Sequence, residues 1–214
     1  MTSQRLRYSP LVEALAFSGY VAWYIWQLQE AFFFSWIIIS VWLAASFLLY
    51  KDTPQSLGLR ADNAPNAAKR SALVFLPCVA GIVVIALFLG AGHRSISSLL
   101  VPRHFFGYMM FCFVQQIGLN SLVTNRLLSA TGSILQSCLI AGALFGLLHW
   151  PNPVLVLVTV VGGALMSWLF AKERNIFVLA VWQAILGTLV WWAFPLAWHH
   201  GMRVGPGFYR FHLQ

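Results

Sequence analysis

Seven long apolar runs constrain this chain more than any other feature of its sequence. They cover approximately residues 9–29, 31–50, 71–91, 104–129, 133–150, 153–171 and 175–198. Each run is close to the roughly 20 residues that an α-helix needs to cross the hydrocarbon core of a bilayer. Because unpaired backbone cannot face lipid, a spanning segment is either a helix or part of a closed barrel. The runs show no alternation of apolar and polar residues, which favours helices.

The composition points to the same class of protein. Of the 214 residues, 60% are hydrophobic and only 8% are charged, whereas a soluble domain has about 25% charged residues. We therefore expect one all-α domain over residues 1–214, a polytopic membrane helical bundle. About seven transmembrane helices are predicted, or eight if the last run breaks at Pro195.

The connectors between the runs are short, with one exception. The first two runs meet at "QLQEA", which predicts a tight hairpin, and "HWPNP" predicts a break in the ladder because proline cannot continue a regular helix. The long polar connector 51–70 contains "SLGLR". This segment predicts a short interfacial helix whose Leu57 and Leu59 enter the headgroup region.

The basic residues predict the orientation. With the N-terminus in the cytoplasm, nine Lys and Arg side chains fall on the inner side and four on the outer side. The inner set is Arg5, Arg7, Lys51, Arg60, Lys69, Arg70, Arg126, Lys172 and Arg174, and the outer set is Arg94, Arg103, Arg203 and Arg210. This excess favours a cytoplasmic N-terminus. It also accounts for the net charge of +8 through the anionic leaflet, without nucleic acid as a partner.

Five polar residues lie inside the apolar runs, namely Gln115, Gln116, Asn120, His149 and Gln183. Gln116 and Asn120 are four residues apart and so share one helical face. Such side chains often hydrogen-bond between membrane helices, at about 0.6 kcal/mol per contact. They also mark pockets and pathways in membrane proteins. Both interpretations stay open for this set.

Carboxylates are missing from the region that holds these five residues. The chain has only Glu13, Glu30, Asp52, Asp62 and Glu173, so none occurs between positions 62 and 173. The polar set therefore lacks the usual general base and a standard ligand for hard metals. One histidine with amides is a poor zinc site, and the three cysteines follow no metal-binding spacing, so no metal is predicted.

The order of these segments resembles the CPBP family, which comprises the type II CAAX prenyl endopeptidases and the bacteriocin-processing, Abi-type membrane proteins. That family typically carries Glu-Glu-x-x-x-Arg in one span, Phe-x-x-x-His in the next, and His-x-x-x-Asn, or a similar small residue in place of the Asn, in a later one. Here "QQIGLN" at 115–120, "FGLLH" at 145–149 and "QAILG" at 183–187 fall on these motifs. The resemblance covers approximately residues 104–192.

The chain departs from the family pattern at most of its functional positions. The two glutamates correspond to Gln115 and Gln116, the arginine to Asn120, and the later histidine and its partner to Gln183 and Gly187. Only Phe145 and His149 match. Glutamine has nearly the shape of glutamate but cannot take up a proton at neutral pH. The resemblance thus implies a vestigial site at Gln115, Gln116, Asn120, His149 and Gln183, with no catalytic residue assigned.

Two functions are compatible with this pattern. The first is a non-proteolytic accessory, scaffold or binding subunit of a membrane complex, located in the bacterial inner membrane with its N-terminus in the cytoplasm. Its predicted partners are the bilayer and other membrane subunits; no cofactor is predicted, but the ten Trp and 17 Phe leave room for a bound lipid, quinone or pigment. The alternative is an active endopeptidase, or another enzyme on prenylated or lipid-like substrates, that uses His149.

The small-residue motif "GALFG" at 142–146 predicts close helix contacts, within the chain rather than between copies.

Overall fold

The computed structural model describes residues 2–90 and 102–211, and these residues are helical apart from their connectors. The long helices are α1 (Thr2–Trp23), α2 (Trp36–Leu49), α3 (Ala64–Phe88), α4 (Pro102–Gln116), α6 (Ile134–Leu147), α7 (Pro153–Glu173) and α8 (Ile176–Ala193). Shorter segments are η1 (Tyr24–Leu28), η2 (Phe33–Ser35), η4 (Ile117–Thr124), α5 (Asn125–Thr131), α9 (Leu196–His199), η5 (His200–Met202) and α10 (Pro206–Tyr209). The predicted all-α class is therefore confirmed.

Four helical stretches are long and apolar enough to cross a membrane. They are Ala64–Phe88, Phe105–Thr131, Pro153–Glu173 and Ile176–Ala193, and the apolar helices Trp36–Leu49 and Ile134–Leu147 are shorter. Each predicted run corresponds to a helical segment, but the predicted count of seven or eight transmembrane helices is not established by these lengths.

Local sequence explains where several helices begin and end. Ser133, Asn152 and Asn175 cap α6, α7 and α8 by accepting a hydrogen bond from a backbone N–H in the first turn. Gly132 ends α5 in the left-handed conformation, with φ +64°. The "HWPNP" break is confirmed, since α6 ends at Leu147 and α7 begins at Pro153. The hairpin at "QLQEA" is also confirmed, between Leu28 and Phe33.

The predicted interfacial helix at "SLGLR" is wrong. Residues 54–58 form turns instead, and Leu57 is only 8% exposed. The backbone turns at Gly58, where φ is +75° and an added Cβ would come within 2.7 Å of the Phe170 ring. Ser121 donates a hydrogen bond to the carbonyl oxygen of Leu57. Leu57 and Gly58 are therefore packed against the bundle, whereas Leu59 stays 37% exposed.

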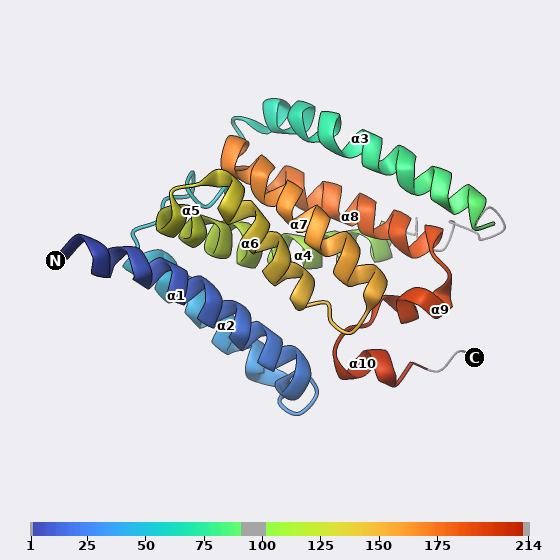
Figure 1. Ribbon diagram of the computed structural model, residues 1–214, viewed down its shortest axis with the longest axis horizontal. Helices are drawn as coiled ribbons and strands as arrows, with labels where there is room; N and C mark the ends of the chain where they lie inside the picture. The colour runs from blue at the N-terminus through green and yellow to red at the C-terminus, as the bar shows by residue number, and fades with distance from the viewer. Residues whose placement is uncertain (1, 91–101, 212–214) are drawn as a thin grey trace.

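The helices form a bundle with a laterally attached hairpin (Figure 1). α6 packs on α7, α4 packs on α8, and α3 lies along the outer side of α8. α1 and α2 contact each other through the rings of Phe17, Tyr20 and Trp42, and they reach the rest of the molecule mainly through α5 and η4. The short helices α9 and α10 lie beside the beginning of α7, where its capping residue Asn152 donates hydrogen bonds to the carbonyl oxygens of His199 and Arg203. This arrangement leaves two cavities beside α4, which are described below.

Candidate functional site

The polar residues of the fourth apolar run lie where its helix changes pitch. Gln115 and Gln116 are the last residues of α4, and Asn120 and Thr124 belong to the π-helical segment η4. A π-helical stretch inserted in an α-helix is rare and frequently occurs at functional sites. Gln116, Asn120 and Thr124 have no exposed surface. The wider turn thus directs a series of polar side chains into the interior.

Hydrogen bonds join the four predicted amides into one chain. The Gln183 Nε2 donates to Gln115 Oε1 at 2.5 Å, and the Gln116 Nε2 donates to Gln183 Oε1 at 2.6 Å. The Asn120 Nδ2 donates to Gln116 Oε1 at 2.5 Å. The hydrogen bonds thus bring together residues that are up to 68 positions apart in the sequence.

The hydroxyls of Thr124 and Ser167 extend this chain. Thr124 Oγ1 lies 3.0 Å from Asn120 Oδ1 and 3.0 Å from Ser167 Oγ. Within the chain, the Gln116 Nε2 also lies 3.1 Å from the Met166 sulfur, which can only accept. That contact determines which end of the Gln116 amide carries the nitrogen, and so sets the direction of the whole chain. We call Gln115, Gln183, Gln116 and Asn120 the amide chain.

His149 is not hydrogen-bonded to the amide chain. Its Nδ1 lies 2.7 Å from the carbonyl oxygen of Phe145. Since a carbonyl oxygen only accepts, Nδ1 carries the proton, and in the neutral ring Nε2 is the acceptor. The Phe145 ring meets the imidazole edge-on, with centroids 4.8 Å apart. The motif "FGLLH" thus builds a histidine of defined tautomer one turn after its orienting carbonyl.

Two apolar cavities meet at this site. The first, of about 400 Å³, lies among α3, α4, α7 and α8, and the second, of about 360 Å³, lies between the α1–α2 hairpin and α4, η4 and α6. Five residues line both cavities, namely Phe111, Gln115, Phe145, His149 and Val204. We call them the shared wall. Gln115 and His149 are its polar members, so both can contact a molecule held in either cavity.

At Gly187 the structure leaves no space for a side chain. A Cβ at this position would collide with the hydroxyl of Tyr108. The Tyr108 ring of α4 therefore fills the place beside Gln183, and it also lines the first cavity. No group of three or more His, Cys, Asp or Glu side chains that could hold a metal ion occurs among the described residues.

Each Asp and Glu side chain is paired with an arginine. The pairs are Arg60–Asp62, Arg70–Glu173, Arg126–Glu13, Arg126–Asp52 and Arg210–Glu30. These pairs account for all five Asp and Glu residues of the sequence. None of these carboxylates lines either cavity, and the described lining of both cavities contains no Lys or Arg either. The site is therefore electrically neutral.

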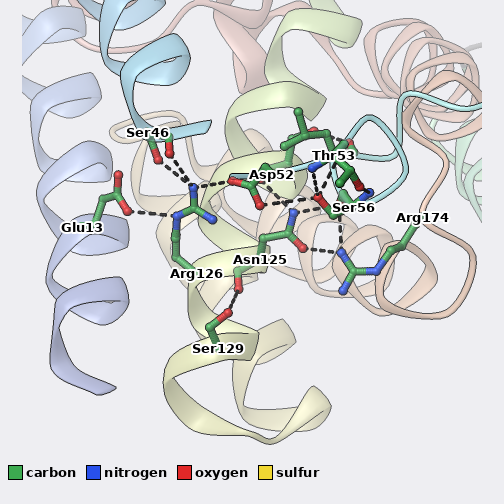
Figure 2. Close-up of polar contacts among 11 residues, drawn as sticks. Glu13, Ser46, Asp52, Thr53, Ser56, Asn125, Arg126, Ser129 and Arg174 are labelled. Atoms are coloured by element: carbon green, nitrogen blue, oxygen red, sulfur yellow. Dashed lines mark hydrogen bonds and ion pairs between the residues drawn. The ribbon is translucent and has the colours of Figure 1, made fainter. Parts of the chain in front are cut away.

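The structure contains a second polar centre, at the N-terminal end of α5, that sequence reasoning missed (Figure 2). Arg126, which the orientation argument counted on the inner side, is only 2% exposed and belongs to α5. Its Nε donates to Glu13 of α1 at 2.9 Å, and its Nη2 donates to Asp52 at 2.7 Å and to Ser46 Oγ of α2 at 2.8 Å. Tyr50 covers the guanidinium, with the ring centroid 3.8 Å away.

Arg174 continues this centre on the opposite side of Asn125. Its Nη1 donates to Asn125 Oδ1 at 2.6 Å and to the carbonyl oxygen of Ser56 at 2.9 Å. Burial lowers the pKa of the Arg174 guanidinium, and the charge of Asp52 opposes this shift. Two arginines thus balance Glu13 and Asp52, and together they fasten α1, α2 and the 51–63 connector to α5. The sequence does contain a signal for this centre, because Glu13 lies inside the first apolar run and Arg126 inside the fourth.

The helical stretches and apolar cavities define an integral membrane protein with a neutral polar site in its core. Residues 99–189 match the family model of the type II CAAX prenyl endopeptidases, Rce1-like. The resemblance to the CPBP family is thereby confirmed for this part of the chain, which contains the amide chain and His149. No match was found among curated proteins or among solved structures.

Proposed function

We propose that this protein is a non-proteolytic relative of the CAAX-type intramembrane endopeptidases, acting as an accessory, scaffold or binding subunit of a membrane complex. One observation carries the proposal: all five carboxylates are paired with arginines, and the site itself holds amides in their place. A glutamate-based protease activates water with a carboxylate, and an amide cannot take up that proton.

The amide chain also supports the proposal that the catalytic groups of the family motif were lost together. Arginine and both glutamates of the family motif are replaced together, by Asn120, Gln115 and Gln116. A buried charge left without its partner is costly. Replacing only one of the three charged residues would leave such a charge, whereas neutral residues at all three positions leave none. The hydrogen bonds that join the amides keep the site ordered without any charge.

The proposed setting is the inner membrane of a bacterium, with the N-terminus in the cytoplasm. Arg126 and Arg174 both contact the 51–63 connector, which lies at the end of the bundle that the basic residues assign to the cytoplasm. The cavities are the proposed place for a bound lipid, quinone or pigment, and the proposed partners are other membrane subunits.

Restoring the two glutamates tests the proposal. We expect Gln115→Glu combined with Gln116→Glu to leave the hydrolysis of prenylated or membrane-anchored peptides at background, because Asn120 and Gln183 supply neither the arginine nor the histidine of the family motif. The double variant also loses the donation from Gln116 to Gln183, at a cost of about 1–3 kcal/mol of stability. Robust cleavage by the double variant would contradict the proposal.

Purification from native membranes in a mild detergent, followed by quantitative mass spectrometry, tests the positive half of the proposal. A protein partner at a fixed ratio to this chain is the expected result. A preparation that contains the chain alone and cleaves the peptides would reject it.

The alternative, an enzyme that uses His149, is favoured by the free acceptor at His149 Nε2. Its test is the same hydrolysis assay with the unchanged protein and with His149→Ala. Turnover that this substitution abolishes would establish the alternative and exclude the non-proteolytic function.

A further inference from the structure

The amide chain has a direction, and the direction determines what it presents at its cavity end. Gln183 uses both its amide oxygen and its nitrogen within the chain, and so does Gln116. Gln115 accepts through Oε1 only, and its Nε2 has no hydrogen-bond partner among the described residues. Because Gln115 lines both cavities, the chain ends with an N–H donor at the shared wall.

His149 presents the complementary group at the same wall. Its Nδ1–H is used by the Phe145 carbonyl oxygen, and its Nε2 has no hydrogen-bond partner among the described residues. In the neutral ring this nitrogen is an acceptor. The shared wall therefore offers one donor and one acceptor, surrounded by apolar side chains. A hydroxyl group can accept from the first and donate to the second.

The remaining lining excludes a charged ligand. No Lys, Arg, Asp or Glu of the described chain lines either cavity. An ionised headgroup would lose its hydration there without an opposite charge, which is strongly unfavourable. Ligand pockets commonly have volumes of about 300–1,000 Å³, so each cavity has room for an alkyl chain.

Resting on the proposed function as a binding subunit, we propose that these cavities bind an uncharged single-chain lipid with a hydroxyl group, such as a long-chain alcohol. The hydroxyl lies at the shared wall, where it accepts from Gln115 Nε2 and donates to His149 Nε2. The alkyl chain occupies one of the two apolar cavities. This assignment gives the otherwise unused polar atoms of the site their partners.

A series of probes with one chain length tests this assignment on the full chain in nanodiscs. Dodecanol, dodecyl methyl ether, dodecane and dodecyl phosphate compete with a fluorescent fatty alcohol. We expect dodecanol to bind about fivefold more tightly than the ether, which can accept but not donate, and the ether about fivefold more tightly than dodecane. Dodecyl phosphate should bind about tenfold or more weakly than dodecanol.

Two variants assign the two hydrogen bonds. Gln115→Met removes the donor, so the ether should lose its advantage over dodecane. His149→Phe removes the acceptor, so dodecanol should lose its advantage over the ether. Gln136→Leu, which deletes an exposed amide of α6 outside both cavities, is the matched control and should leave the series unchanged. Retained affinity for dodecane shows that each variant is folded.

Equal affinities for dodecanol and dodecane in the unchanged protein would overturn the assignment, as would preferred binding of the phosphate. The assignment would also be overturned if Gln115→Met still preferred the ether to dodecane and His149→Phe still preferred dodecanol to the ether. The result is independent of proteolysis. A protein that prefers dodecanol and cleaves peptides contradicts only the non-proteolytic function, and one that cleaves nothing and prefers the phosphate contradicts only the ligand class.

Discussion

Arg126 is the one Lys, Arg, Asp or Glu residue of the apolar run 104–129, and only 2% of its surface is exposed. Transfer of such a charge out of water costs several kcal/mol, and the cost is offset only when partners and hydrogen bonds are well placed. Glu13, Asp52 and Ser46 supply three acceptors at 2.7–2.9 Å. These residues belong to three other segments, so one side chain joins the hairpin to the bundle.

Replacement of Arg126 should therefore destabilise the fold strongly. We expect Arg126→Met to destabilise the protein by about 3–5 kcal/mol, because Glu13 and Asp52 are left without their opposite charge. Neutralising both in the same protein, with Glu13→Gln and Asp52→Asn, should recover part of the loss. Unfolding followed by circular dichroism in mixed micelles measures both effects. Arg60→Met, which breaks an exposed pair, is the control and should have little effect.

The outcome that contradicts this view is a loss of stability no larger for Arg126→Met than for Arg60→Met. A triple variant that is no more stable than Arg126→Met would show, in turn, that the burial of unpaired carboxylates is not the cause.

At the scale of the elements, α6 and α7 approach each other through glycines. A Cβ at Gly142 would lie 2.5 Å from the carbonyl oxygen of Val160 and 2.8 Å from the backbone nitrogen of Ala164. A Cβ at Gly163 would lie 3.2 Å from the Cα of Gly142. The small residues thus serve packing within the chain, as the sequence predicted. This close contact also positions Phe145 and His149, which follow on the same helix and its end.

A pair of alanine substitutions separates packing from helix propensity. We expect Gly142→Ala to cost about 1–3 kcal/mol, because backbone atoms block the new methyl group and cannot move aside easily. Gly162→Ala on α7 meets nothing within 4 Å and should be neutral or stabilise by up to about 1 kcal/mol. Melting temperatures of the two variants in the same detergent provide the comparison. Similar destabilisation by both would refute the close packing of α6 on α7.

Prediction of the elements succeeded where a local signal exists and failed where packing decides. The two prolines of "HWPNP" located the break before Pro153, and apolar runs located the helices. The π-helical turns of η4 follow no recognisable composition, because they arise from how that stretch packs against its neighbours. The turn at 54–58 was mistaken for a helix, since its leucines indicate burial but not against which surface.

At the scale of the whole molecule, the two ends of the bundle differ in charge. One end carries Arg174 and the 51–63 connector, joined by the hydrogen bond from Arg174 to the Ser56 carbonyl oxygen. The other end carries the exposed pair Arg210–Glu30. The proposed orientation places the first end in the cytoplasm, in agreement with the excess of basic residues there.

Cysteine labelling tests this orientation. In a background without the native cysteines, Gln55→Cys should resist a membrane-impermeant maleimide in intact spheroplasts and react after lysis. Tyr209→Cys, at an exposed position on the opposite end, should react before lysis. Both residues are exposed, so the fold should tolerate them. Labelling of Gln55→Cys, but not of Tyr209→Cys, in intact spheroplasts would reverse the orientation.

The sequence by itself determined the class of this protein, the position of its helices and the neutral composition of its polar core. These properties depend on local runs of residues and on which residue types are present or missing, both of which can be read along the chain. The resemblance to the CPBP family likewise rested on motifs that each lie within one helix or its end.

Only the tertiary structure decided how these pieces meet. It selected Glu13 and Asp52 as partners of Arg126, ordered the amides so that Gln115 ends the chain, and placed Gln115 and His149 on one wall between two cavities. The physical reason is that these contacts join residues tens of positions apart, up to 113 for Arg126 and Glu13. Their geometry depends on how helices pack against one another, which no local pattern encodes.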